Sequence, residues 1–283
     1  MSKRFGQNFL VHRPSRLRIL DLVQASVGAN VWEIGPGIGS MTALALDSGL
    51  ALTAFEIDYG FARLLKRLFG GRSNFALVEG DFIDTWRAEL EASPSLERAL
   101  QRGPERIFGN LPYNAASSIV ASIIEGGLRP ARMVFTVQRE GALRMTARPG
   151  TKDYSAFSVL CSSAFATKIA FDLGAGCFWP APRVQSSVVL MVPRTDPLED
   201  GDRAGFSAFV RAAFSSRRKT LRNNLRDSEA EILPEVLAEL ALRADVRAEA
   251  LAPEELAEVY ERLRRAAPSA DESGSRLTPC QRC

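Results

Sequence analysis

The residues best suited to chemistry in this 283-residue chain form the run Asn110-Leu111-Pro112-Tyr113. An amine on an aromatic ring, such as N6 of adenine, is a poor nucleophile because its lone pair is delocalised, so a catalyst must accept its hydrogens. The Asn110 side-chain oxygen and the Leu111 carbonyl can supply two acceptors, and Pro112 fixes the loop. Tyr113 can stack on an extruded base. We interpret the run as a catalytic loop; the alternative is a plain Asn-x-Pro turn.

A glycine-rich turn precedes this loop in the sequence GPGIG, residues 35–39. Gly35 and Gly37 allow the backbone to turn sharply and to approach a ligand closely. Ser40 stands where a dinucleotide-binding fingerprint requires its third glycine, so the spacing argues against a pyrophosphate. Because the acidic Glu33 comes just before the turn, the arrangement favours a ligand with an amino-acid cation, which we predict to be S-adenosylmethionine.

Two further acids follow the next two predicted strands. Glu56 lies 21 residues beyond Gly35, where a carboxylate can accept both hydroxyls of a ribose. Asp81 is placed to accept from the amine of the cofactor's adenine. A helix cap is the alternative for each acid, and for Asp58 in particular. The ordered series of glycine turn, acid and acid at successive strand ends supports the cofactor interpretation.

The elements that must position these residues form an alternating series of strands and helices. Predicted strands span residues 31–34, 52–57, 75–78, 106–108, 133–137 and 187–192, and predicted helices span 15–27, 41–50, 61–69 and 86–101. This alternation indicates an α/β, Rossmann-like, doubly wound fold with a mostly parallel sheet. Ligands bind beyond the carboxyl ends of such strands, which is where the glycine turn, both acids and Asn110 fall.

A polar, acidic stretch at residues 195–201 divides the chain. We predict an N-terminal segment at 1–14 that covers the cofactor, a class I methyltransferase domain at 15–195, and a small all-helical domain at 202–267. Residues 268–283 are expected to be disordered. They contain Cys280 and Cys283, a CxxC pair without a second ligand pair, so we expect no metal site.

Composition and charge narrow the function further. The chain is 46% hydrophobic, and it has no apolar run of signal-peptide or transmembrane length, so we expect a cytoplasmic protein without a membrane partner. The net charge is +3, but the segment from Arg203 to Arg226 carries seven Arg and Lys residues and no acid. A solvated helix face is one interpretation, and a nucleic-acid-binding surface is the one we favour.

Several segments resemble the KsgA family of ribosomal RNA adenine dimethyltransferases, over nearly the whole chain. In the family's order they are KRFGQNFL (3–10), EIGPGIG (33–39), EID (56–58), GD (80–81) and NLPYN (110–114). The first resembles an N-terminal signature that folds over the cofactor. The run FSSRRKTLRNNL (214–225) resembles the helical domain of the bacterial small-subunit enzyme.

The resemblance implies a role for each matching residue. It assigns cofactor contact to Asn8, Leu10, Gly35, Glu56, Asp81 and Asn110. It assigns catalysis to Asn110, Leu111, Pro112, Tyr113 and Phe178, with Phe178 stacking on the target base opposite Tyr113. It assigns RNA binding to Arg217, Arg218, Lys219 and Arg222.

By the same resemblance, the substrate is a pair of adjacent adenines in the hairpin near the 3′ end of 16S rRNA. Each would be dimethylated at N6, with S-adenosylmethionine and no metal, by a monomer acting within an assembling 30S subunit. The chain departs from the family pattern at Ala181, Arg183 and Gln185, and at Ala115-Ala116 after the catalytic loop. These departures bear on substrate positioning, since none removes a proposed cofactor ligand.

Three other functions compete with this interpretation. An erythromycin-resistance methyltransferase shares the catalytic core but acts on large-subunit rRNA, and the motif at 217–225 argues against it. A non-catalytic 30S assembly or RNA-binding factor is disfavoured by the intact Glu56, Asp81 and catalytic loop. A DNA adenine methyltransferase is disfavoured because its loop normally carries two prolines, whereas the loop at 110–113 has one.

Overall fold

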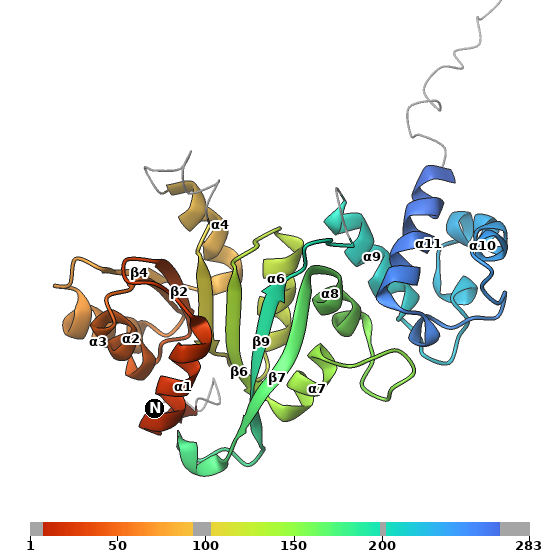
Figure 1. The fold of residues 1–283 in the computed structure, drawn as a ribbon. Helices are drawn as coiled ribbons and strands as arrows, with labels where there is room; N and C mark the ends of the chain where they lie inside the picture. Colours follow the sequence, from red (N-terminus) through yellow and green to blue (C-terminus); the bar gives the residue numbers. More distant parts are fainter. Residues whose placement is uncertain (1–7, 93–102, 199–201, 267–283) are drawn as a thin grey trace, which may run out of the picture.

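The computed structural model describes residues 8–92, 103–198 and 202–266 (Figure 1). Its centre is a seven-stranded sheet with the strand order β4-β3-β2-β5-β6-β9-β7. The parallel strands are β2 (Asn30–Ile34), β3 (Ala51–Glu56), β4 (Phe75–Glu79), β5 (Arg106–Asn110) and β6 (Arg132–Gln138). Next to β6, strand β9 (Ser186–Pro193) runs antiparallel between β6 and β7 (Phe165–Leu173). The predicted doubly wound, mostly parallel fold is confirmed.

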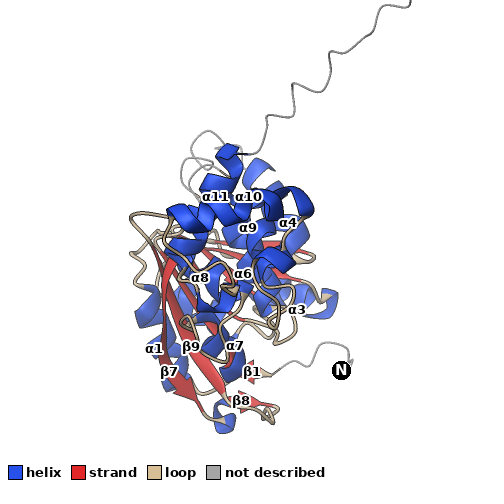
Figure 2. Ribbon diagram, turned by 90° about the vertical axis from the view of Figure 1, so that its right-hand side faces the viewer, coloured by secondary structure: helices blue, strands red, loops and turns tan. Residues whose placement is uncertain are grey.

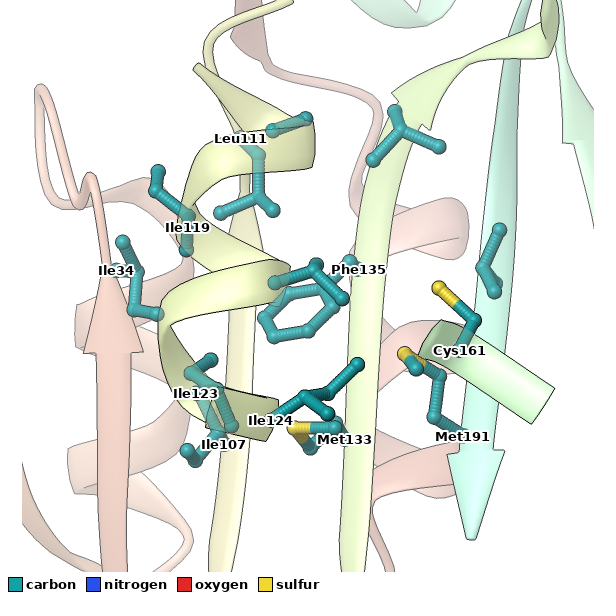
Figure 3. Close-up of a cluster of buried hydrophobic side chains, with 14 of the residues drawn as sticks. Ile34, Ile107, Leu111, Ile119, Ile123, Ile124, Met133, Phe135, Cys161 and Met191 are labelled. Atoms are coloured by element: carbon teal, nitrogen blue, oxygen red, sulfur yellow. The ribbon is translucent and has the colours of Figure 1, made fainter. Parts of the chain in front are cut away.

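Helices cover both faces of the sheet because successive strand residues point to opposite sides. On one face lie α1 (Arg13–Val23), α2 (Ser40–Asp47) and α3 (Tyr59–Phe69), and on the other α4 (Phe82–Ala92), α6 (Ala116–Glu125), α7 (Arg139–Met145) and α8 (Ala156–Ala164). In β2, for example, Val31 packs with the first group and Trp32 with the second. Figure 3 shows part of the second group, in which Ile123 and Ile124 of α6 face Ile107 and Met133.

The predicted strands agree closely with the structure, but several helix ends differ. Helix α1 ends at Val23 rather than near residue 27, because Gln24 adopts a left-handed conformation with φ of 48°. Helix α4 begins at Phe82, and the part of the predicted helix 86–101 after residue 92 lies outside the described residues. The apolar stretch 155–171 divides into helix α8 and strand β7. Its hydrophobic run alone does not separate a buried helix from a strand.

After Asp202 the described elements are all helical. They are α9 (Arg203–Ala213), η2 (Arg222–Asn224), α10 (Asp227–Glu239), η3 (Ala248–Ala250) and α11 (Pro253–Ala266). Residues of α9, α10, η3 and α11 share a hydrophobic cluster that also includes Tyr154, just before α8, and Val159, within it. The Tyr154 hydroxyl donates to the Leu251 carbonyl at 2.9 Å. These helices lie beyond the β7 edge of the sheet (Figure 1).

A second, two-stranded sheet joins β1 (Phe9–Leu10) to β8 (Phe178–Trp179), which follows the short helix η1 (Ala175–Cys177). The two strands lie side by side, away from helices α9 to α11 (Figure 2). Two-residue strands have no detectable sequence period, so this sheet was not predicted. No helix in the described ranges is long and apolar enough to span a membrane. The predicted tail at 268–283 lies outside those ranges.

Candidate active site

A pocket opens at the carboxyl ends of β2, β3 and β5, where the fold places ligands. It gathers most of the residues predicted for cofactor contact and catalysis: Asn8, Leu10, Gly35, Glu56, Asn110, Leu111, Pro112 and Tyr113. The remaining lining residues are Phe9, Glu33, Pro36, Gly37, Ser40, Met41 and Ile57. The charged members of this lining are two acids, so the pocket suits a ligand that carries positive charge.

The glycine turn forms one wall of the pocket. Gly35 and Gly37 have φ values of +69° and +56°, which L side chains rarely adopt. At Gly37 a side chain is excluded for a second reason, because a Cβ atom would come within 2.8 Å of the Phe9 ring. The Gly35 N–H donates to the Phe55 carbonyl at 3.0 Å, which fixes the turn against β3. The backbone here can therefore approach a ligand closely, as the sequence predicted.

Glu56 fixes the turn from the end of β3. The residue is 3% exposed, and its Oε2 accepts the Gly37 N–H at 2.9 Å while its Oε1 accepts the Asp58 N–H at 2.9 Å. Burial raises the pKa of Glu56, although both backbone donors favour its charged form. The carboxylate is thus held at a defined position beside the turn.

Glu33 was not among the contact residues predicted from the sequence, although its charge favoured an amino-acid cation, and the structure shows it in the pocket lining. Its side chain is 2% exposed, and Oε2 accepts the Thr42 hydroxyl at 2.6 Å. Burial, with a smaller contribution from the negative charge of Glu56, raises the pKa of Glu33 to about 8. A buried acid with one hydrogen-bond donor would be stabilised by a cation in the pocket.

The catalytic loop presents two acceptors. Asn110 Nδ2 donates to the Asn8 carbonyl at 2.7 Å, and the Leu111 N–H donates to the Thr136 carbonyl at 3.0 Å. The Pro112 carbonyl accepts the N–H groups of Ala115 and Ala116, both at 3.0 Å. Within the described part of the chain, Asn110 Oδ1 and the Leu111 carbonyl accept no hydrogen bond. These are the two atoms that the sequence predicted as acceptors for an amine.

A serine that sequence reasoning missed fixes Tyr113. The Tyr113 hydroxyl and Ser186 Oγ lie 2.8 Å apart, and Ser186 is fully buried at the start of β9. The contact joins residues 73 positions apart, so no local sequence pattern indicates it. It limits rotation of the Tyr113 ring at the pocket edge.

Comparison with known proteins agrees with this geometry. A family model for ribosomal RNA adenine dimethylase matches residues 1–265. The chain belongs to this family. Two relatives named ribosomal RNA small subunit methyltransferase A support the assignment. The Treponema denticola protein is 43% identical over 89% of this chain and 86% of its own length, and the Rubrobacter xylanophilus protein is 40% identical over 92% and 94%.

Two solved methyltransferase structures share the fold of this chain. A dimethyladenosine transferase from Plasmodium falciparum has a TM-score of 0.75 at 20% identity, over 91% of this chain and 98% of its own. The 23S rRNA methyltransferase ErmE has a TM-score of 0.63 at 24% identity, over 91% of this chain and all of its own. These likenesses concern the fold alone.

Asp81 is a predicted site residue that does not line the pocket of this dimethylase-family chain. It follows β4, and its Oδ1 accepts the Ile83 N–H at 2.9 Å at the start of α4. Its Oδ2 has no partner among the residues that the structure describes. Asp58 caps α3 by accepting the N–H groups of Gly60 and Phe61, so the helix-cap alternative is confirmed there. A cofactor contact of Asp81 stays a prediction.

Phe178 likewise lies outside the pocket lining. Its side chain is 4% exposed and packs in the same hydrophobic cluster as Leu10, with which Phe178 pairs across β1 and β8. The neighbouring Trp179 is 56% exposed. Stacking of Phe178 on a base would thus require its ring to leave this cluster, and the predicted role is not tested by the structure.

The four residues predicted to bind RNA differ in their surroundings. Arg217 Nε donates to Glu249 at 2.8 Å, and its Nη1 donates to the Lys152 carbonyl at 2.6 Å. The other three are exposed and form no ion pair within the described ranges: Arg218, Lys219 and Arg222. Arg217 therefore joins the helical part of the chain, residues 202–266, to the loop before α8. The other three side chains remain available to a ligand.

No group of three His, Cys, Asp or Glu side chains in the described segments is arranged to hold a metal ion. Cys161 is buried and Cys177 is partly buried, both as free thiols. Cys280 and Cys283 lie outside the described residues.

Proposed function

We propose that the protein transfers methyl groups from S-adenosylmethionine to the N6 amines of two adjacent adenines in the 3′-terminal hairpin of 16S rRNA. One observation carries the proposal. Two acceptors of the catalytic loop that no described donor contacts, Asn110 Oδ1 and the Leu111 carbonyl, stand beside a glycine turn and two buried acids. The names of the relatives as small-subunit methyltransferases support the choice of RNA.

The pocket residues fit S-adenosylmethionine by their chemistry. We assign Glu56 to the ribose hydroxyls and Asp81, through the Oδ2 that no described residue contacts, to the adenine amine. Asn8, Leu10, Gly35 and Asn110 complete the predicted contacts, and Glu33 is the acid whose ionised form a bound amino-acid cation would favour. When bound, the cofactor supplies a methyl group already activated by a sulfonium charge.

The chain's part in the transfer is to position the target amine and to stabilise positive charge on it. The bound cofactor would supply the methyl group, adenine N6 would accept it, and N6 would then release a proton to solvent. Asn110 Oδ1 and the Leu111 carbonyl accept the N6 hydrogens, so they stabilise the charge that develops on nitrogen. Tyr113 stacks on the extruded base, with its hydroxyl fixed by Ser186.

The helical part supplies the electrostatic contact with RNA in this proposal. Arg218, Lys219 and Arg222 are exposed, and cations of this kind contact phosphates without reading sequence. We further propose that the protein acts as a cytoplasmic monomer on an immature 30S subunit, and that Phe178 forms the second stacking face. An erythromycin-resistance type of methyltransferase, or a non-catalytic assembly factor, is an outcome that the experiment must be able to return.

The test incubates the full chain with labelled S-adenosylmethionine and one of three substrates: undermethylated 30S subunits, 50S subunits or duplex DNA. Digestion and chromatography then identify the modified nucleoside. We expect label in N6,N6-dimethyladenosine from 30S subunits only. Label in 50S subunits alone would identify the large-subunit activity instead, and binding to 30S without any label would identify an assembly factor.

A further inference from the structure

Strand β1 contacts two parts of the pocket that are distant in the sequence. Ser40 Oγ, at the start of α2, donates to the Leu10 carbonyl at 2.9 Å. The Phe9 ring lies so close to the glycine turn that a Cβ atom on Gly37 would come within 2.8 Å of it. On its other edge, β1 pairs with β8, in which Phe9 faces Trp179. The backbone from Phe9 onward is therefore fixed against the glycine turn and against strand β8, which carries Phe178.

The segment continues to be fixed after β1. The N–H groups of Val11 and His12 both donate to the Cys177 carbonyl, at 2.9 and 3.1 Å. The Arg16 guanidinium bridges two carbonyls, with Nη1 at 2.8 Å from that of Ser40 and Nη2 at 3.2 Å from that of Val11. The position of this backbone is thus set by several elements at once.

The catalytic amide is attached to this segment. Asn110 Nδ2 donates to the Asn8 carbonyl at 2.7 Å, across 102 residues of sequence. A carbonyl oxygen can only accept, so the amide must turn its NH₂ group toward Asn8. Oδ1 then takes the opposite position, where no described donor contacts it. The hydrogen bond to Asn8 therefore decides which atom of Asn110 is offered to a target amine.

We propose that β1 is the positioning element for the catalytic amide, and that the Asn8 carbonyl selects asparagine over aspartate at position 110. The inference rests on the proposed methyl transfer and deepens it. Aspartate has nearly the same shape, and its carboxylate is the stronger acceptor for the hydrogens of an amine. Both of its oxygens only accept, however, so one of them would face the Asn8 carbonyl oxygen and repel it. The N-terminal backbone, rather than the reaction, requires an amide here.

The first test compares the pH dependence of Asn110→Asp with that of the wild type. At pH 8 the introduced carboxylate repels the Asn8 carbonyl, and we expect kcat to fall by about 100-fold. As the pH falls, the carboxyl group of the variant becomes protonated, so it can donate to Asn8 through its O–H and accept through its other oxygen. We expect kcat of the variant, relative to the wild type, to recover by about tenfold per pH unit. A ratio that stays constant with pH, or a near-wild-type kcat at pH 8, would overturn the inference.

Asn74→Asp is the matched control. Asn74 Nδ2 also donates to a backbone carbonyl, that of Leu50 at 2.9 Å, but outside the pocket lining. The same conflict between carboxylate and carbonyl then lowers stability without touching the catalytic loop. We expect the ratio of its kcat to that of the wild type to be independent of pH. A pH-dependent ratio like that of Asn110→Asp would mean that the first result reflects stability, and would overturn the inference.

A second measurement does not depend on activity. The backbone N–H groups of Val11 and His12 both donate hydrogen bonds to the Cys177 carbonyl, so exchange of their hydrogens reports whether the segment after β1 is held in place. In Asn110→Asp we expect them to exchange about tenfold faster than in the wild type at pD 8, and at the wild-type rate at pD 6. Unchanged exchange at pD 8 would overturn the inference. Failure of the wild type to methylate any RNA would overturn the proposed function instead, and exchange would still test the contact.

A double-variant cycle with Ser40→Ala separates the contact from a general loss of structure. Removing the hydroxyl that holds Leu10 lets the Asn8 carbonyl retreat from a carboxylate at position 110. We expect the loss of kcat in Ser40→Ala/Asn110→Asp to be about tenfold smaller than the product of the two single losses. Losses that multiply would show that β1 does not transmit the effect.

Discussion

The pocket and the basic segment at 203–226 hold their polar groups in opposite ways. In the pocket, Glu33 and Glu56 are buried, and Glu56 is fixed by two backbone N–H groups. In the basic segment, Arg218, Lys219 and Arg222 are exposed and form no ion pair within the described ranges. A buried group in fixed geometry acts through position and low dielectric, whereas exposed cations act through their summed field.

Mutations are expected to act differently in the two regions. Loss of one atom in the pocket removes a contact that no neighbour can replace, while loss of one exposed cation leaves the others to attract phosphate. Arg217 shows that a residue within the basic segment can be fixed by its neighbours rather than exposed and unpaired. It lies in the basic segment but is fixed by Glu249 and by the Lys152 carbonyl, as the pocket residues are fixed by their neighbours.

The largest effect is expected for Asn110→Ala. The change removes the acceptor Oδ1, so methyl transfer to 30S subunits should fall by at least about 1000-fold. Because Asn110 lines the pocket and the exposed cations belong to the helices after Asp202, the dissociation constant for 30S subunits should change by less than about twofold. Initial rates of label transfer and filter binding measure the two quantities. Transfer at a near-normal rate would mean that Asn110 is not the acceptor.

The next effect concerns the exposed cations. The combined change of Arg218, Lys219 and Arg222 to alanine should weaken RNA binding by about 10- to 100-fold at low salt and should reduce the salt slope by up to about 3. The fully saturated kcat should stay near that of the wild type. Arg217→Ala is the contrasting variant. It should lower the free energy of unfolding and leave the salt slope of RNA binding nearly unchanged. A triple variant with an unchanged slope would remove this surface from the RNA interface.

A smaller effect is expected for Glu33→Gln, measured by urea unfolding without cofactor at pH 6 and pH 8. The folded-state pKa of Glu33, about 8, lies above its ordinary value of 4.5. Its contribution to stability is thus present below about pH 4.5 and is lost as the pH rises toward 8. Between pH 6 and pH 8 we expect the free energy of unfolding of the wild type to fall by about 2 kcal/mol relative to that of the variant. A constant difference would show that Glu33 is ionised in the folded protein.

The smallest effect compares one helix cap from each region. Asp58 caps α3 beside the pocket, and Asp202 caps α9 by accepting the Gly205 N–H at 2.9 Å. Each change to alanine should lower the unfolding free energy by about 1 kcal/mol. Asp202→Ala should lose somewhat more, because Asp202 also accepts the Tyr260 hydroxyl. Thermal unfolding measures both, and a loss of more than about 3 kcal/mol at Asp58 would indicate a role beyond capping.

The sequence by itself determined the fold class and the main pocket residues. Three local features each leave a pattern within a few residues. They are strands with apolar residues on both faces, glycines that need a left-handed backbone, and acids at strand ends. For this reason the sequence alone predicts that Gly35, Glu56 and Asn110 lie together, and the structure confirms that they line one pocket.

Only the tertiary structure decided which partner each side chain meets. The contacts Asn8–Asn110, Tyr113–Ser186 and Arg217–Glu249 span 102, 73 and 32 residues, and no periodicity connects such positions. Burial of Phe178 beside Leu10 depends in the same way on a pairing of two-residue strands. Long-range packing sets these contacts, because it fixes which surfaces meet after the local elements have formed.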